Sequence, residues 1–163
     1  MRKKIYWCAP ISWMLFIFYS SAQPYQNQDV RPALDRYLNL QIIEPYVASV
    51  QFMYNQSEVS VAALGLNGFV EFFIRKGAHV FVFFMLTCLF YLALSKNAPA
   101  TFGRNLSLSV LLTIGYAVLD EWHQSFTPNR TAFWGDVVID GIGALIAMLV
   151  ILFIHKLRQR KLN

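Results

Sequence analysis

Residues 106–130 read LSLSVLLTIGYAVLDEWHQSFTPNR, and this stretch decides the fold because an apolar run continues into a dense polar segment. Residues 106–119 contain no charged side chain, whereas residues 120–130 contain two acids, a histidine and an arginine. A run of this polarity, extended by the residues at its ends, predicts a helix that crosses a membrane, because a helix satisfies its own backbone hydrogen bonds in lipid. The acids directly after the run predict a polar site near the end of that helix, since charges are costly at such depth.

The whole chain has the composition of a membrane protein. Hydrophobic residues make up 56% of its 163 residues and charged residues 14%, and the mean hydropathy is +0.42. This balance is too apolar for an ordinary soluble domain. We predict an all-α polytopic membrane protein, a single domain over residues 1–163, with four transmembrane helices at about residues 5–22, 76–95, 106–125 and 134–154. A second interpretation treats residues 1–22 as a signal peptide that is cleaved after small residues.

The positions of the charges predict the orientation of these helices. A set of basic residues flanks one end of the four apolar runs, and none of the nine acidic residues lies with them. The set is Arg2, Lys3, Lys4, Lys96, Arg104, Lys156, Arg158, Arg160 and Lys161. The positive-inside rule then places both termini in the cytoplasm of a multi-pass cell-membrane protein and residues 23–72 outside the cell. The net charge of +5 is therefore a topology signal. The lipid bilayer is the expected partner, no nucleic acid is expected, and the oligomeric state is left open.

The segment between the first two helices, residues 23–72, is the least regular part of the sequence. Residues 33–43 and 58–74 mix apolar and polar side chains at helical spacing. Three interpretations stay open for them: amphipathic helices on the membrane surface, a lid over a site in the bundle, or a partly ordered loop.

Apolar runs of nearly equal length place polar groups from all four helices at one depth. The runs cover residues 5–19, 80–95, 106–119 and 141–154. At 1.5 Å per residue each spans roughly 21–24 Å of a hydrocarbon layer that is about 30 Å thick. The polar residues at the outer ends of these runs are Ser20, His79, Asp120 and Asp140. One helical turn further out, on the same faces, are Lys76, Gln124 and Asp136. We therefore predict a polar pocket that opens outward, since ionisable groups in a membrane face a protein interior or water.

Turn and glycine residues around the last two helices support close packing at this pocket. Residues 128–130 read Pro-Asn-Arg and predict a turn that carries the arginine back over the pocket. Glycines without a side chain let helix backbones approach in lipid. We expect this role for Gly135, Gly141 and Gly143.

At these polar positions the sequence resembles the VanZ-like family, which is named for a teicoplanin resistance protein. The matching motifs are Ser20-Ser21-x-Gln23-Pro24, Arg75-Lys76-x-x-His79, Asp120-Glu121-x-x-Gln124-x-Phe126-x-Pro128-x-Arg130 and Asp136-x-x-x-Asp140-x-x-Gly143. The third motif is the most specific, and the resemblance covers most of the chain except residues 30–65. Asp140 departs from the pattern, since asparagine is expected there in many relatives. The resemblance implies a small bacterial membrane protein linked to reduced glycopeptide susceptibility, and it implies no particular reaction.

The pocket residues suggest an envelope protein that binds or modifies a ligand at the outer leaflet. A lipid-linked wall precursor, a glycopeptide or a lipid headgroup are the expected ligands, and arginine holds phosphate with a bidentate fork. The expected ligand-binding residues are Ser20, Arg75, Lys76, Gln124, Arg130, Asp136 and Asp140.

The main alternative is a membrane-embedded hydrolase or transferase that acts on a lipid-linked substrate. Two carboxylates in different surroundings divide acid and base roles, so Asp120 or Glu121 would act as the base and His79 as an acid or orienting group. Another alternative is a metal site on these three residues and Asp140, although no metal and no cofactor is expected. A structural cluster of salt bridges without catalysis is a further interpretation. A transport path is disfavoured because the inner half of each helix lacks charged groups.

Overall fold

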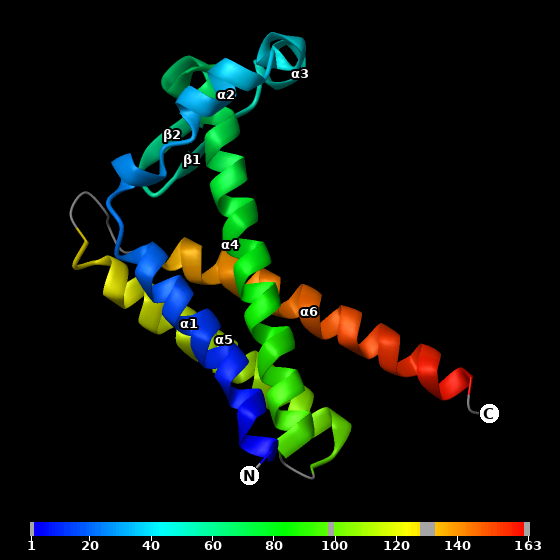
Figure 1. The fold of residues 1–163 in the computed structure, drawn as a ribbon. Helices are drawn as coiled ribbons and strands as arrows, with labels where there is room; N and C mark the ends of the chain where they lie inside the picture. The colour runs from blue at the N-terminus through cyan, green and yellow to red at the C-terminus, as the bar shows by residue number, and fades with distance from the viewer. Residues whose placement is uncertain (1, 98–99, 128–132, 162–163) are drawn as a thin grey trace. The chain divides into compact units, whose positions relative to one another are not determined.

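A computed structural model describes residues 2–97, 100–127 and 133–161 of the chain (Figure 1). The elements in chain order are η1 (Arg2–Trp7), α1 (Cys8–Ser21), η2 (Tyr25–Gln28), α2 (Arg31–Tyr37), η3 (Leu40–Ile42), α3 (Glu44–Val47), β1 (Gln51–Tyr54), β2 (Ser57–Ser60), α4 (Val61–Asn97), α5 (Phe102–Gln124) and α6 (Trp134–Arg160). The chain divides into two compact units. The first is Met1–Gln23 with His79–Asn163, and the second is Pro24–Ala78, so the boundary falls inside α4.

Helices α4, α5 and α6 are each long and apolar enough to cross a membrane. The segment formed by η1 and α1 is a fourth candidate when it is counted with the helical residues that follow it. The predicted all-α polytopic membrane protein is therefore confirmed. Two elements extend past the predicted spans: α4 begins at Val61 rather than near residue 76, with a non-helical residue, Gly65, after its first turn, and α6 ends at Arg160 rather than near residue 154. The orientation and the single-domain assignment stay predictions.

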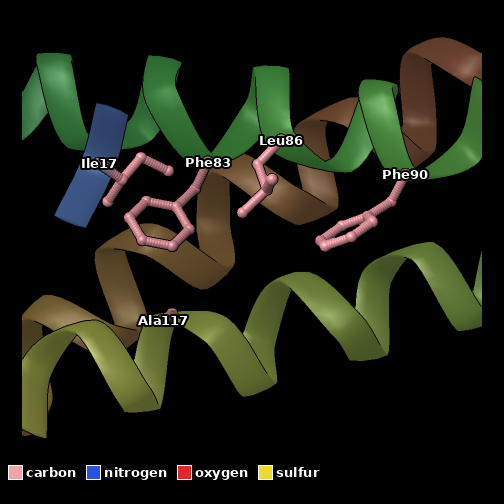
Figure 2. Close-up of a cluster of buried hydrophobic side chains, with 5 residues drawn as sticks. All are labelled: Ile17, Phe83, Leu86, Phe90 and Ala117. Carbon is pink, nitrogen blue, oxygen red and sulfur yellow. The ribbon is translucent and has the colours of Figure 1, made fainter. Parts of the chain in front are cut away.

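The core of the first unit forms where α1, α4 and α5 meet. Phe83, Leu86 and Phe90 lie on one face of α4 at spacings of three and four residues. Figure 2 shows these side chains directed toward α5, with Ile17 from α1 and Ala117 from α5 in the same cluster. The cluster thus combines large side chains on α4 with a small one on α5.

Two hydrogen bonds from aromatic side chains to backbone carbonyls tie α1 to its neighbours. Trp13 Nε1 donates to the carbonyl oxygen of Val82 on α4 at 3.0 Å. The hydroxyl of Tyr116 on α5 donates to the carbonyl oxygen of Met14 at 2.6 Å. Polar groups without partners are costly in lipid, so these bonds favour one position of α1. The end of α1, at Ser21, is thereby held beside α5.

Helix α5 carries its buried residues on one face along its whole length. They are Asn105, Leu106, Ser109, Val110, Thr113, Ala117, Asp120, Glu121 and Gln124. The hydroxyl of Thr113 lies 3.0 Å from that of Thr87 on α4, and it also donates to the carbonyl oxygen of Ser109. Small and hydroxyl-bearing residues allow close helix packing in lipid. Asp120 and Gln124 lie at the end of the same face, which is why these polar groups lie inside the unit.

Helix α6 packs against α4 at Gly143. A Cβ atom at this position would press on the backbone of α4, with the nitrogen of Phe84 at 3.0 Å. Only glycine allows helix backbones to approach this closely, so the packing role predicted for Gly143 is confirmed. The prediction was wrong for Gly141, where a Cβ would meet nothing within 4 Å. At Gly135 the atoms nearest to an added Cβ belong to the ring of Phe133, so its role in packing against another helix stays a prediction.

The Pro24–Ala78 unit contains a hairpin formed by β1 and β2. The turn consists of Asn55 and Gln56, which both have positive φ, 49° and 61°. Asparagine tolerates this conformation, and turns of this kind match the twist of paired strands. Of the three interpretations left open for residues 58–74, a helix over the whole range is wrong, because the first residues of this range belong to β2. Residues 33–43 are helical in part, in α2 and η3.

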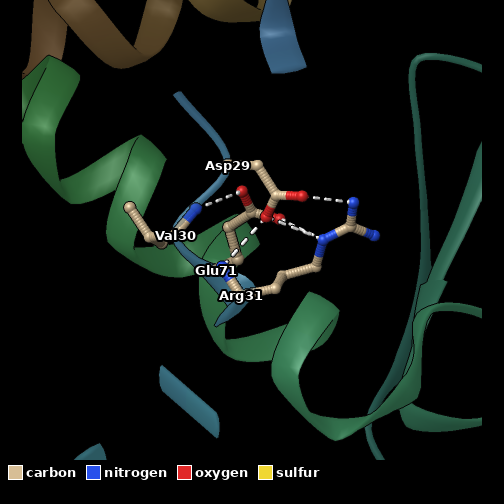
Figure 3. Close-up of polar contacts among 4 residues, drawn as sticks. All are labelled: Asp29, Val30, Arg31 and Glu71. Atoms are coloured by element: carbon tan, nitrogen blue, oxygen red, sulfur yellow. Dashed lines mark hydrogen bonds and ion pairs between the residues drawn. The ribbon is translucent and has the colours of Figure 1, made fainter. Parts of the chain in front are cut away.

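A buried acid joins α2 to α4 within the second unit (Figure 3). Glu71 Oε1 accepts a hydrogen bond from the backbone nitrogen of Val30 at 3.4 Å, and its Oε2 lies 3.6 Å from Arg31 Nε. The Arg31 guanidinium also binds Asp29 through two atoms, Nε to Oδ1 at 2.9 Å and Nη2 to Oδ2 at 2.6 Å. This hydrogen-bonded pair lowers the pKa of Asp29 from 3.8 to about 2.

Candidate functional site

Asp120 is buried on α5 and receives two hydrogen bonds on one carboxylate oxygen. Ser21 Oγ from α1 donates to Oδ2 at 2.9 Å, and Gln124 Nε2 from the next turn of α5 donates to the same oxygen at 2.8 Å. The other oxygen, Oδ1, is buried and has no hydrogen-bond partner among the described residues. Buried polar groups are normally paired, so this oxygen is an enclosed acceptor whose hydrogen bond is not made by any described residue.

A second polar pair joins α4 to α6. His79 Nδ1 lies 3.0 Å from Asp140 Oδ1. The Asp140 side chain is 1% exposed, whereas the His79 side chain is 25% exposed. The carboxylate is therefore enclosed while the imidazole reaches the edge of the packed helices. The contact forms because Asp140 lies three residues before Gly143, on the face of α6 that packs against α4.

Glu121 has a local structural contact in addition to its predicted catalytic role. The side chain is buried, and its Oε1 accepts a hydrogen bond of 2.5 Å from the backbone nitrogen of Phe133. Phe133 directly precedes α6, where free backbone N–H groups and the helix dipole favour an acid. Glu121 thus holds the start of α6 beside the end of α5, and its predicted role as a base stays a prediction.

Together these side chains and one further acid of α6 form what we call the polar cluster. Its members are Ser21, His79, Asp120, Glu121, Gln124, Asp136 and Asp140. The carboxylates are close enough for Glu121 to interact electrostatically with the three aspartates. Like charges inside an apolar bundle are costly to keep. The cluster is therefore the strongest candidate for a functional site in the first unit.

None of the three predicted cationic residues lies in the described part of the first unit. Arg130 and the turn predicted around it lie outside the described residues. Arg75 and Lys76 belong to the Pro24–Ala78 unit. There the Lys76 ammonium lies 4.4 Å from the centroid of the Tyr54 ring, a cation–π contact. The ligand-binding roles of these three residues, and that of the partly buried Asp136, stay predictions.

The structure adds residues that the sequence analysis did not select. The hydroxyl bonded to Asp120 belongs to Ser21, whereas the predicted Ser20 is partly buried next to it. The Thr127 hydroxyl donates to the carbonyl oxygen of Ser21 at 3.4 Å, which ties the segment after α5 to α1. His123 stacks on Phe18 of α1 with ring centroids 4.0 Å apart. The length of the apolar run does not decide which of the two adjacent serines faces α5. A known contact between α1 and α5 would have identified Ser21, because adjacent residues point in different directions.

Observations on the described residues bear on two of the alternative functions, the metal site and the transport path. Among residues 2–97, 100–127 and 133–161, no three His, Cys, Asp or Glu side chains lie close enough together to hold a metal ion. In the other half of α5 the buried hydroxyls of Ser109 and Thr113 donate to backbone carbonyls of their own helix. Such bonds are typical of hydroxyls that serve helix packing.

The chain was compared with known proteins. A family model described as VanZ/LLP1 matches residues 6–155, a range that includes every member of the polar cluster. No curated protein matches the chain, and no solved structure matches it.

Proposed function

Because the chain belongs to the VanZ/LLP1 family, we propose that this membrane protein binds or modifies an envelope ligand and thereby lowers susceptibility to glycopeptide antibiotics. The ligand is taken up by the polar cluster from the outer leaflet of the cell membrane. This orientation follows from the distribution of basic residues, which places both termini in the cytoplasm.

The unpaired, buried oxygen Oδ1 of Asp120 is the observation that supports this proposal most directly. Ser21 and Gln124 already hold Oδ2, so the carboxylate has one fixed orientation. Oδ1 then has no partner among the described side chains although Asp120 is only 3% exposed. Preorganised acceptors of this kind bind donors more tightly than mobile ones, because no ordering of the side chain is needed on binding.

The chemistry of the cluster fits a lipid-linked wall precursor or the glycopeptide itself. Both carry hydroxyl and amide donors for Asp120, and a diphosphate linkage suits the bidentate fork of an arginine, the role predicted for Arg130. Large apolar side chains next to the cluster are exposed, with Leu119 on α5 58% exposed. A lipid chain attached to the ligand would lie along this apolar surface.

A membrane-embedded hydrolase or transferase is the second candidate function. The contact between the buried Asp140 and the partly exposed His79 supports it, because a carboxylate behind an imidazole is the usual support of a proton-accepting histidine. The substrate would be the same lipid-linked ligand, so the two candidates share one site.

Ligand binding is tested by thermal unfolding of the full chain in lipid nanodiscs. Teicoplanin and a polyprenyl-diphosphate-linked wall precursor are added separately. Binding to the folded state raises Tm by mass action. We expect a shift in Tm for the wild type with at least one probe. We expect none for Asp120→Asn, which replaces one acceptor oxygen of the carboxylate by an amide donor and keeps the shape of the side chain.

The matched control is Glu44→Gln, which neutralises an exposed acid in α3 and is expected to keep the full shift. Equal shifts in Asp120→Asn and the wild type would contradict binding at this carboxylate. No shift of the wild type with either probe would contradict the ligand class.

A further inference from the structure

The arrangement of His79 and Asp140 determines which ring nitrogen of His79 is available. An ionised carboxylate only accepts hydrogen bonds, so an ionised Asp140 would hold the His79 ring proton on Nδ1, which lies 3.0 Å from Asp140 Oδ1. In the neutral ring the second nitrogen, Nε2, then carries a lone pair. Nε2 has no hydrogen-bond partner among the described residues, and the ring is partly exposed. The lone pair is therefore open to an incoming group.

The backbone around the pair makes its geometry rigid. Gly143 lies against the backbone of α4, where a Cβ would press on the carbonyl oxygen of Val80, the residue after His79. The helix crossing is thus one residue from His79 and three residues from Asp140. Positions near a close crossing have little freedom to separate. The two side chains are consequently held together by packed backbone rather than by a mobile loop.

The surroundings of the pair are acidic. Asp120 lies within electrostatic range of both His79 and Asp140, and Asp136 and Glu121 lie within range of Asp140. A positive charge that develops on the His79 ring would be stabilised by these groups. Direct contact with the ring is made by Asp140 alone among the described carboxylates.

We propose that His79 Nε2 accepts a proton from a hydroxyl group or a water molecule at the bound ligand, and that Asp140 is the positioning residue for this step. The O–H bond of the hydroxyl or water breaks, the Nε2–H bond forms, and the resulting imidazolium is balanced by the Asp140 carboxylate. This assignment rests on the proposed function, since the ligand must reach the polar cluster. It makes the base of the site an imidazole rather than Asp120 or Glu121, and it favours hydrolysis or group transfer on a lipid-linked substrate.

The tautomer of His79 tests the arrangement without any ligand. The full chain, labelled with ¹⁵N-histidine, is placed in nanodiscs, and the ring nitrogens are recorded at alkaline pH, where imidazole is neutral. The signal of His79 is identified by its loss in His79→Gln. We expect the proton on Nδ1 in the wild type, and loss of this preference in Asp140→Ala. Asp136→Ala removes an acid one turn away on α6 and is expected to leave the tautomer unchanged.

The second arm tests whether Nε2 faces the ligand. Diethyl pyrocarbonate reacts with an unprotonated imidazole nitrogen, and mass spectrometry reports each histidine separately. We expect His79 to react and the polyprenyl-diphosphate-linked precursor to slow this reaction by about the ratio of its concentration to its Kd. His155 on the opposite end of α6 serves as the internal control and is expected to react equally with and without the precursor.

The outcomes separate this inference from the proposed function. A proton on Nε2 in the wild type, or an unchanged tautomer in Asp140→Ala, would overturn the role of the pair whether or not the ligand binds. A precursor that raises Tm but leaves the reaction of His79 unchanged would overturn it too, while the proposed function stands. Absence of any Tm shift would count against the proposed function, and the tautomer would still decide the arrangement of the pair.

Discussion

The Ser21 hydroxyl on α1 donates a hydrogen bond of 2.9 Å to Oδ2 of Asp120 on α5, and both side chains are buried. This contact belongs to the fold and to the site at the same time. It ties the end of α1 to α5, and it orients the carboxylate so that the buried Oδ1 has no hydrogen-bond partner among the described residues. Changes at Ser21 are therefore expected to affect stability and ligand response together.

Ser21→Ala is expected to lower the free energy of unfolding by about 0.6 to 1.7 kcal/mol, the range of side-chain hydrogen bonds between membrane helices. The matched control is Ser107→Ala on α5, where the serine is exposed, with an expected change within about 0.5 kcal/mol. Reversible unfolding in mixed micelles measures both variants. Equal stability of the two variants would show that the bond between Ser21 and Asp120 contributes nothing.

Gly143→Ala and Gly141→Ala form a pair of variants with opposite expected signs. At Gly143 the new methyl group would press on the backbone of α4, and overpacking of this kind costs about 1–3 kcal/mol. At Gly141 the methyl group meets nothing within 4 Å, and replacing a helical glycine by alanine stabilises by about 0.5–1 kcal/mol. The same unfolding measurement distinguishes them. A stabilised Gly143→Ala would contradict the close crossing of α4 and α6.

The lengths of the apolar runs predict that polar groups from all four helices share one depth, but they do not predict the rotation of the helices. Adjacent residues on a helix point about 100° apart, so run length alone cannot decide whether Ser20 or Ser21 faces α5. The pairing of His79 with Asp140 follows from the close crossing at Gly143, which depends on tertiary packing.

The hairpin shows a different limit of sequence reasoning. Short segments that mix apolar and polar residues fit helix and strand almost equally well. A helix and a partly ordered loop therefore both stayed open for residues 58–74, whereas the turn at Asn55 and Gln56 makes residues 58–60 part of β2. The long apolar helices were predictable because lipid leaves the backbone few other options.

Thr87→Val and Thr113→Val test the hydroxyl contact between α4 and α5. Each hydroxyl also bonds a carbonyl of its own helix, so each variant is expected to lose only about 0.6 kcal/mol, with a coupling no larger than about 1.7 kcal/mol. A double-mutant cycle of unfolding free energies measures this coupling. Teicoplanin protection is expected to be unchanged, and its loss in either variant would indicate that this half of the bundle takes part in function.

Asp29 provides a pH-dependent prediction for the second unit. Its pKa is lowered to about 2 by the hydrogen bonds and charge of Arg31. The stabilisation from the pair is therefore present above the ordinary pKa of 3.8 and is lost as the pH falls through about 2. The pKa of Asp29, measured by a carboxyl titration followed by ¹³C NMR, is expected to return toward 3.8 in Arg31→Gln and to stay low in Arg36→Gln. A wild-type midpoint near 3.8 would show that the pair does not form.

The central claim, that the polar cluster carries the resistance function, is tested most directly by teicoplanin susceptibility in a sensitive Gram-positive host. The host carries the wild type, Asp120→Asn, Glu44→Gln or the empty vector, and membrane abundance is measured for each by a tag. We predict protection by the wild type and by Glu44→Gln, and the susceptibility of the empty vector for an equally abundant Asp120→Asn. Full protection by Asp120→Asn at equal abundance would contradict the account, because the open carboxylate would then be dispensable.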